Sequence, residues 1–429
     1  MTDLNASIPT LRGLIALSPI IIFAALYLGI SLAAGDFYAM PLSLAFVTAS
    51  VWAVAIGFRK GTLHDRITVM SKTAGSPNIV GMIWIFILAG AFASLASVTG
   101  AVDATVALAL RYLPGELMIP GLFAAACFIS LSIGTSVGTV VALTPLAVEL
   151  ATECGGNIGL LIATVLGGAF FGDNLSFISD TTIAATRSQG VPMNAKFKAN
   201  LAIVLPAALI TLCVYVFIGF EVNDYTPSGG VDVWLVMPYL LVLILAIMGV
   251  NVNIVLVCGI LASLTVGLLS GLELSSMAKA MAGGIDAMGD LIIVTLLAAG
   301  MLGLIKYYGG IDWLLSAMTR HVHGSRGAKA TMLLLVGTVN ACTANNTVAI
   351  ITVGGISSDI SRKFGIAPAR TASILDTGSC IVQCLIPYGA QTLLATGMAN
   401  ISPAAPWPYL YYPWALLACV IFTVLFRRG

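Results

Sequence analysis

Long apolar runs separated by short polar connections make up most of this chain. Six of these runs are 14–34, 41–58, 78–98, 199–220, 234–250 and 408–426. Each is close to the ~20 residues that an α-helix needs to cross a bilayer. Because lipid offers the backbone no hydrogen-bond partner, the pattern predicts membrane-spanning helices in these runs.

The composition agrees with a membrane location. Hydrophobic residues make up 59% of the 429 residues and charged residues 9%, which leaves too little polar surface to cover a water-soluble protein of this size. The formal net charge is +1, so the chain offers no basic face for a nucleic acid. The sequence therefore predicts an all-α polytopic membrane protein whose surroundings are the lipid bilayer.

Residues 76–220 and 284–428 are two versions of one pattern. In each version the apolar run is interrupted at the same place by a polar stretch, which is GTSVGT at 134–139 and CTANNT at 342–347. Further landmarks match on both sides of these breaks, and their offset drifts only from 208 to 210 residues. On the 208-residue spacing, the sequence pairs Thr135 with Thr343 and Thr139 with Thr347. Such a regular match indicates an internal duplication.

The lysines and arginines predict the orientation in the membrane. Each copy has five full spans plus the interrupted segment, which either crosses the bilayer or dips in and returns. If this segment returns and the N-terminus is cytoplasmic, 17 of the 19 basic residues face the cytoplasm, whereas a crossing segment gives a split of 11 to 8. The positive-inside rule favours the first arrangement, with both termini on the cytoplasmic side of the inner (cytoplasmic) membrane. Five crossings per copy then place the second copy upside down relative to the first.

The expected architecture is two inverted repeats, each with five transmembrane helices plus a re-entrant helical hairpin. The expected boundaries are 1–220 for the first repeat, with hairpin tip 134–139 and broken helix 158–189, 221–232 for an external linker, and 233–429 for the second repeat, with hairpin tip 342–347 and broken helix 366–397. Both broken helices are expected at the membrane midplane, where the hairpin tips meet.

The hairpin tips are candidate sites for ions or substrate. Backbone carbonyls and hydroxyls that are free of helical bonding provide hard oxygens that replace the water around Na⁺. The candidates are Thr135, Ser136 and Thr139 in the first tip, and Thr343, Asn345, Asn346 and Thr347 in the second. The alternative is that small polar residues only allow helices to pack closely in lipid. Two matching tips at symmetric depth favour the functional interpretation.

The stretch GGAFFGDNLSFISDTTIAAT, residues 167–186, brings acidic and hydroxyl side chains directly after an apolar run. Its polar members are Asp173, Asn174, Ser176, Ser179, Asp180, Thr181 and Thr182. A carboxylate at membrane depth is costly unless it is paired, solvated or protonated, so it normally marks an ion or proton path. Burial favours the protonated form and a bound cation favours the charged form, which makes H⁺ and Na⁺ mutually exclusive ligands. For Asp180 the alternative is a cap on the helix that starts near Thr181.

Outside this stretch, the two copies distribute their polar side chains differently. At an offset of 210 residues, Gln383 stands where the first copy has Asp173, while Asp376 is an acidic residue that only the second copy carries. We expect Asp376, Thr377 and Gln383 to contact a substrate or second ion. The alternative for Asp376 is a polar residue buried in helix packing. Glu149, on the returning arm of the first hairpin, either relays protons or only reaches the outer surface.

The chain resembles the NhaC family of sodium/proton antiporters, within the wider ion transporter superfamily, over nearly its whole length. The most specific element is GAFFGDNLSFISDTT, which is similar to the family pattern GAxFGDxxSPxSDTT, together with the GTSVGT stretch before it. Phe177 departs from the proline of that pattern, and CTANNT is more like the asparagine–threonine tips of dicarboxylate carriers. The resemblance implies that Asp173, Asn174, Ser176, Asp180 and Thr181 lie on the ion path. It also implies a transport unit that moves against a scaffold, often in a homodimer.

Together these features predict a secondary active transporter, not an enzyme. The leading hypothesis is exchange of Na⁺ for H⁺ without any cofactor, with Asp173 and Asp180 alternately protonated and bound to Na⁺. The alternative is a Na⁺- or H⁺-coupled carrier of a small organic anion or amino acid, malate/lactate-like or methionine-like, in which CTANNT and Gln383 bind the solute. The chain has no HExxH motif or nucleotide-binding loop, and Phe171-Gly172-Asp173 matches the GxGD motif of intramembrane proteases only in part. A passive channel is a further alternative, which concentrative uptake would exclude.

Overall fold

The computed structural model describes residues 10–34, 39–57, 60–112, 115–133, 135–153, 156–176, 179–219, 232–248, 250–319, 322 and 324–426. Within these ranges the regular elements are helices, and no strand occurs. Seven candidate spans in the described residues are long and apolar enough to cross a membrane. The prediction of an all-α polytopic membrane protein is therefore confirmed. Of the expected external linker, only Asp232 lies within the described residues.

The helices follow the same order in the two halves of the chain. The first half has α1 (Thr10–Ala34), α2 (Leu42–Ala55), α3 (Leu63–Ala74), α4 (Pro77–Val98), α5 (Ala101–Tyr112), the 3₁₀ helix η1 (Gly115–Leu117), α6 (Met118–Ile133), α7 (Ser136–Glu153), α8 (Ile158–Leu175), α9 (Asp180–Gln189) and α10 (Met193–Gly219). The second half has α11 (Val233–Ile247), α12 (Val252–Leu269), α13 (Leu274–Ala287), α14 (Gly289–Tyr307), α15 (Gly310–Thr319), α16 (Gly324–Thr343), α17 (Asn346–Lys363), α18 (Pro368–Leu385), α19 (Ala390–Met398), the 3₁₀ helix η2 (Trp407–Tyr409) and α20 (Tyr411–Phe426).

The helix starts give a register for the duplication. Helices α17, α18 and α19 begin at 346, 368 and 390, each 210 residues after α7, α8 and α9. Thr135 therefore pairs with Asn345, and the pairing of Thr135 with Thr343 from sequence was wrong by two residues. The physical reason is that the start of the helix, rather than the identity of a threonine, fixes the position of a residue in the tip. The upside-down orientation of the second half stays a prediction of the charge pattern.

Each half contains a helix that stops and restarts. In the first half α8 ends at Leu175 and α9 begins at Asp180, and in the second α18 ends at Leu385 and α19 begins at Ala390. The residues that follow α8 and α18, Ser176 and Ile386, have extended backbone with ψ of 141° and 129°. Such a break leaves backbone groups at the helix ends available for partners other than the helix itself.

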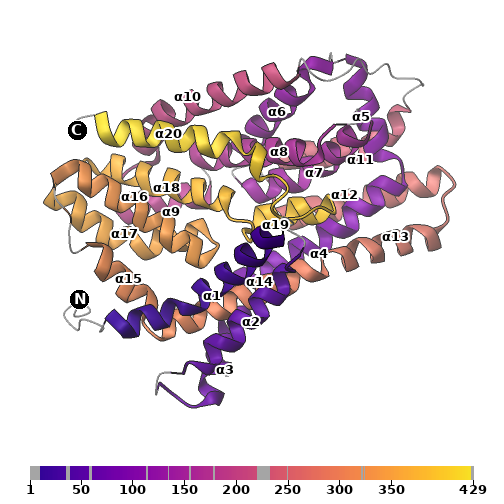
Figure 1. The fold of residues 1–429 in the computed structure, drawn as a ribbon. Helices are drawn as coiled ribbons and strands as arrows, with labels where there is room; N and C mark the ends of the chain where they lie inside the picture. Colours follow the sequence, from indigo (N-terminus) through magenta and orange to yellow (C-terminus); the bar gives the residue numbers. More distant parts are fainter. Residues whose placement is uncertain are drawn as a thin grey trace.

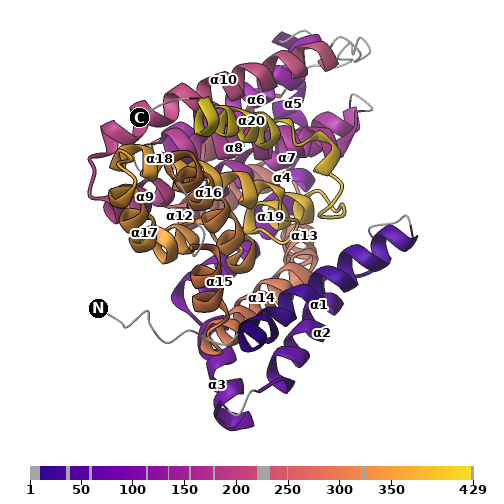
Figure 2. The same ribbon diagram turned by 60° about the vertical axis from the view of Figure 1, so that its left-hand side comes forward.

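The helices pack into two groups, and each group combines parts of both halves. In one group α6 and α7 lie against α8, α9 against α17 and α18, α16 against α18, and α10 against α20. In the other, α2 and α3 lie against α14, α12 and α13 against α4, and α5 against α11. Figures 1 and 2 show α10, α18 and α20 at one side of the molecule and α1, α2, α3 and α14 at the other. We call these the α6–α10/α16–α20 group and the α1–α5/α11–α15 group.

Helix α10 starts earlier than the apolar run predicted. The run begins at Ala199, whereas the helix begins at Met193 and so includes Lys196. Lys196 is one of the 17 basic residues assigned to the cytoplasmic side, but its side chain is only 1% exposed inside the protein. Lys329 and Arg370 are also buried. Removing these three from the 17 leaves 14 against 2, so the charge pattern still favours the same orientation.

Helices α4 and α13 cross with their backbones in contact. A Cβ atom added to Gly284 would lie 2.1 Å from the carbonyl oxygen of Gly90, and one added to Gly90 would lie 2.3 Å from that of Gly284. Close approach through small residues is a common way for helices to pack in a membrane. These two glycines therefore hold α4 and α13 together within their group.

We predict that Gly284→Ala destabilises the protein, because the new methyl group has to push two helix backbones apart. Overpacking of this kind costs about 1–3 kcal/mol. The measurement is the thermal unfolding midpoint of the purified protein in detergent. Gly283→Ala is the matched control, because a Cβ at Gly283 meets nothing within 4 Å. Equal midpoints for the two variants would contradict the backbone contact.

Candidate functional site

A cavity of about 290 Å³ lies where the hairpin tips and helix breaks of the two halves meet. Nine of the fifteen candidate site residues from the sequence line it, and so does Ser179; the nine are Thr135, Ser136, Asp173, Asp180, Thr181, Asn345, Asn346, Thr347 and Gln383. Six do not: Thr139, Asn174, Ser176, Thr343, Asp376 and Thr377. The fold thus gathers residues that are more than 200 positions apart in sequence around one space.

Four helices begin at this cavity. Their first residues, Ser136 of α7, Asp180 of α9, Asn346 of α17 and Ala390 of α19, all line it. The start of a helix carries a partial positive charge and several free backbone N–H groups. The cavity is therefore suited to hold negative charge, either from a carboxylate of the protein or from a bound anion.

Asp173 is the carboxylate at the centre of this arrangement. It lies in the last turn of α8 and is 4% exposed. The backbone N–H of Ser136 donates to its Oδ1 at 3.0 Å, and the Ser136 hydroxyl donates to its Oδ2 at 2.5 Å. Among the described residues, no lysine or arginine forms an ion pair with it. Asp173 is thus stabilised by hydrogen bonds at the start of α7 but not by a counter-charge.

Hydroxyl and carbonyl oxygens surround Asp173 on the side of the helix break. Ser179 Oγ lies 3.5 Å from Asp173 Oδ1 and 2.8 Å from Thr181 Oγ1. The Thr181 hydroxyl also donates to the backbone carbonyl of Asp173 at 3.3 Å. These hard oxygens, together with the carboxylate, are the groups that could hold Na⁺. Asp180 is exposed at the first turn of α9 and lines the same cavity.

A chain of amide side chains connects Asp173 to the second half. Gln391 Nε2 donates to Ser136 Oγ at 2.9 Å, and Gln383 Nε2 donates to Gln391 Oε1 at 3.0 Å and to the carbonyl of Ala344 at 3.0 Å. Ala344, in the second tip, has a left-handed backbone with φ of 49°, a conformation that costs energy for a residue with a Cβ. Gln391 was not among the sequence candidates, although it lies inside the predicted broken helix.

Asp376 does not line the cavity, because a buried lysine binds it. Lys196 Nζ of α10 lies 2.7 Å from Asp376 Oδ2, and the two side chains are 1% and 0% exposed. Asn200 Nδ2 donates to the same oxygen at 2.7 Å. Sequence analysis missed Lys196 and Asn200, since both lie at or before the start of the apolar run. Their spacing of four residues, which puts them on one face of a longer helix, was the available signal.

Three hydroxyl candidates bond to nearby backbone, as expected for the packing alternative. Thr139 Oγ1 donates to the carbonyl of Thr135 at 3.2 Å, Thr343 Oγ1 to that of Asn345 at 3.1 Å, and Thr377 Oγ1 to that of Ser373 at 2.7 Å. Two more candidates offer backbone oxygens at the break. The carbonyl of Asn174 accepts from Lys196 and Asn200, each at 2.7 Å, and that of Ser176 accepts from Thr182 Oγ1 at 2.8 Å.

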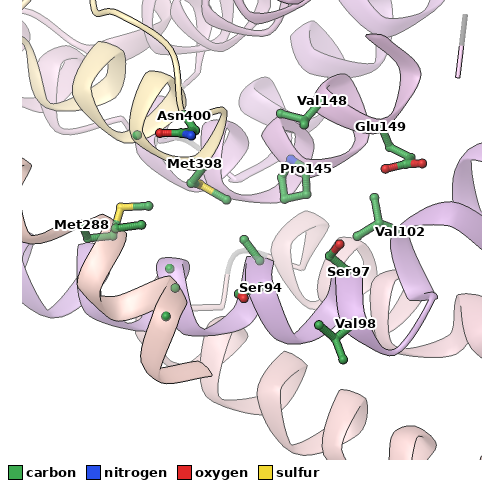
Figure 3. Close-up of a pocket in the computed structure, with 16 residues that line it drawn as sticks. Ser94, Ser97, Val98, Val102, Pro145, Val148, Glu149, Met288, Met398 and Asn400 are labelled. Atoms are coloured by element: carbon green, nitrogen blue, oxygen red, sulfur yellow. The ribbon is translucent and has the colours of Figure 1, made fainter. Parts of the chain in front are cut away.

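A larger cavity, of about 410 Å³, lies toward the other end of α7. Figure 3 shows it between α4 on one side and α7 with the end of α19 on the other, with Glu149, Ser94, Ser97 and Asn400 among its lining residues. Glu149 follows Ser136 by 13 residues, which is ~20 Å along a helix. The α7 residues from Val140 to Pro145 are buried between the two cavities. We regard the smaller cavity as the candidate site because Asp173 and the tips line it.

Comparison with known proteins places the chain in a family. It matches the family described as the Na⁺/H⁺ antiporter family over residues 5–220 and 229–427. It is 26% identical over 388 residues to the Na⁺/H⁺ antiporter NhaC of Bacillus subtilis, with 82% of this chain and 84% of that protein covered. It is 20% identical over 435 residues to the malate-2H⁺/Na⁺-lactate antiporter of Bacillus subtilis, with 94% and 93% covered.

Among solved structures, the chain is similar to the YdaH transporter of Alcanivorax borkumensis, which has an unusual topology. The TM-score is 0.43 and the sequence identity 14%, with 89% of this chain and 97% of that chain covered. The family match is much more extensive in sequence, since it covers nearly every residue of both halves. The protein is therefore a multi-pass membrane transporter that belongs to the Na⁺/H⁺ antiporter family.

Proposed function

We propose that this protein exchanges Na⁺ for H⁺ across the membrane and that Asp173 is the group that holds either ion. The observation that carries the proposal is a buried carboxylate on the wall of a cavity, with hydroxyl oxygens beside it and, in the part of the chain that the structure describes, no basic side chain paired with it. A carboxylate in this position gains from binding a cation or a proton, and one excludes the other. Family membership supports the same function.

The chain's own residues suggest how each ion is held. When Na⁺ is bound, the Asp173 carboxylate and the hydroxyls of Ser179 and Thr181 supply hard oxygens. When a proton is bound, the carboxyl group is neutral and its attraction for a cation is lost. Asp180 at the mouth of the cavity raises the local concentration of cations before they reach Asp173.

We also propose an orientation of the protein in the membrane and a separate role for each of the two groups of helices. We place the protein in the cytoplasmic (inner) membrane with both termini in the cytoplasm, because the basic residues favour that topology. The α6–α10/α16–α20 group carries the ion site, and the α1–α5/α11–α15 group serves as the scaffold against which it moves. A homodimer is the assembly we expect from the resemblance to other carriers.

A second function, coupled transport of a small carboxylate solute, is favoured by the other wall of the cavity. Asn345, Asn346, Gln383 and Gln391 line it, and α17 and α19 start there. No donor among the described residues reaches Gln383 Oε1. Amide groups and helix starts are common partners for the carboxylate of a transported solute. The similarity to the malate-2H⁺/Na⁺-lactate antiporter agrees with this alternative.

Na⁺ alone is sufficient to distinguish the two functions. In proteoliposomes with a pH-sensitive dye inside, we expect Na⁺ added outside to make the interior more alkaline when no organic solute is present. A coupled solute carrier would stay silent until the solute is added. Counterflow of radiolabelled malate, lactate and methionine in the same vesicles checks the alternative, and solute-dependent flux without any Na⁺-driven proton movement would replace Na⁺/H⁺ exchange as the function.

Asp173→Asn is expected to reduce Na⁺-driven proton flux by about two orders of magnitude or more, because an amide neither binds a proton nor carries the charge that attracts Na⁺. The amide still accepts from the Ser136 N–H, so the fold is expected to survive. The control is Asp286→Asn, an exposed aspartate of α13 outside this cavity. Flux like that of the unmodified protein in Asp173→Asn would remove this residue from the mechanism.

The orientation is testable with single cysteines at exposed positions. Lys198 on α10 and Arg326 on α16 are both exposed, and the proposed topology puts both on the cytoplasmic side. In a variant without native cysteines, we expect Lys198→Cys and Arg326→Cys to react with a membrane-impermeant maleimide in inside-out vesicles but not in intact cells. Labelling of both positions in intact cells, as expected if the interrupted segments cross the bilayer, would rule out the re-entrant hairpins.

A further inference from the structure

The buried charges of this protein are few and close together. Among the described residues, the buried acidic side chains are Asp173 and Asp376, and the buried basic ones are Lys196, Lys329 and Arg370. Lys329 and Arg370 lie near the starts of α16 and α18, close enough to repel each other. The ion pair with Asp376 is made by Lys196. Two carboxylates and one ammonium group thus form the charged centre of the α6–α10/α16–α20 group.

Lys196 is in a site that matches an ammonium group. Its Nζ donates to the carbonyl of Asn174 at 2.7 Å and to Thr182 Oγ1 at 2.6 Å, and it lies 2.7 Å from Asp376 Oδ2. An ammonium group has three N–H donors, so these three acceptors use all of them. The site therefore offers one acceptor for each N–H of a lysine ammonium group, and one of these acceptors is a carboxylate.

This ion pair lies directly beside the candidate ion site. Asn174, whose carbonyl accepts from Lys196, is the residue after Asp173. Asp376 is linked to the same residue, because Asn200 Nδ2 donates both to Asp376 Oδ2 and to the carbonyl of Asn174, each at 2.7 Å. A charge left unpaired at Asp376 or Lys196 would therefore change how strongly Asp173 attracts a cation.

We propose that Lys196 neutralises Asp376, so that the buried centre keeps a single uncompensated carboxylate, Asp173, and binds one monovalent cation or one proton at that carboxylate. This inference rests on the proposed exchange of Na⁺ for H⁺. It assigns to Lys196 a positioning role: the residue acts on the transported ion through Asp376 and through the carbonyl of Asn174. Asp376 accordingly serves as the partner of a lysine, not as a direct ligand of the transported ion.

If the proposal is right, transport survives removal of both the Lys196 charge and the Asp376 charge, but not removal of only one of them. Lys196→Met leaves Asp376 as a second unpaired carboxylate that competes with Asp173 for Na⁺ and H⁺. Asp376→Asn leaves an ammonium group that repels Na⁺ from Asp173. In Lys196→Met combined with Asp376→Asn both charges are gone, and replacing a complete buried pair is tolerated far better than removing one partner. The remaining contacts persist, because Asn200 still donates to Asn174 and Thr182 to Ser176.

The experiment is Na⁺-driven proton flux in proteoliposomes for the four proteins of this double-mutant cycle. We expect Lys196→Met to lower the flux by about tenfold or more, Asp376→Asn to raise the Km for Na⁺ by about tenfold or more, and the double variant to return to within about threefold of the unmodified protein. A merely structural pair would also recover its unfolding midpoint in the double variant, but it would leave the Km for Na⁺ of each folded single variant unchanged. The raised Km of folded Asp376→Asn, and its return in the double variant, is therefore the result that identifies an electrostatic role.

Lys198→Met is the matched control, because Lys198 is exposed on the same helix two residues away, and its flux is expected to be unchanged. Size-exclusion profiles and unfolding midpoints confirm that each variant is folded. The inference would be overturned if the folded double variant were no more active than the weaker single variant. It would also be overturned if Lys196→Met had normal flux and Km. Asp173→Asn, assayed in parallel, tests the proposed function separately. If Asp173→Asn is inactive and the double variant is not rescued, the inference about Lys196 is wrong but the proposed exchange of Na⁺ for H⁺ is not.

Discussion

A buried carboxylate that pairs with no lysine or arginine among the described residues is the constraint on which the rest of this structure depends. Such a group is costly in a medium of low dielectric constant, and here Asp173 is stabilised by the backbone N–H and hydroxyl of Ser136 at the start of α7. That contact exists because α7 begins inside the protein, beside the end of α8. The position of this helix start and the buried acid therefore depend on each other.

The helix breaks supply the other polar groups. An unbroken α8 would use the carbonyls near its end for helical hydrogen bonds, whereas the stop at Leu175 leaves the carbonyl of Asn174 to accept from Lys196 and Asn200. The break also brings Ser179 and Thr181 close to Asp173. In a membrane protein, non-helical backbone is tolerated where protein surrounds it or where it lines a cavity, and at this break Ser176 and Ser179 are buried and Ser179 lines the cavity.

The sequence predicted the fold class, the places where helices break and most of the residues that line the cavity, because these depend on local patterns. Apolar runs of ~20 residues specify spans, and polar or glycine-rich interruptions specify breaks. It did not predict Lys196, Asn200 and Gln391 as parts of the centre. Their partners lie on other helices, 176 to 255 residues away, and a lysine at the edge of an apolar run looks the same whether it faces solvent or an aspartate.

The duplication accounts for the matching order of helices in the two halves, but not for the difference between their side chains. Four helices with matching starts surround the cavity. Asp173 and Gln383 occupy equivalent places in the two halves, yet one side chain is acidic and the other is neutral. The symmetry of the fold therefore gives no reason to expect a second ion site at Gln383 that is equivalent to the site at Asp173. The second half contributes amides and Asp376, which pairs with Lys196 of the first half, whereas the carboxylate that lines the cavity, Asp173, comes from the first half.

The hydrogen-bonded series from Asp173 through Ser136, Gln391 and Gln383 to the second tip has one more consequence. Gln391 accepts from Gln383 and donates to Ser136, so both neighbours fix the orientation of its amide group. Under the proposed exchange, the ion held by Asp173 is therefore joined to the tips of both halves by one continuous series of hydrogen bonds.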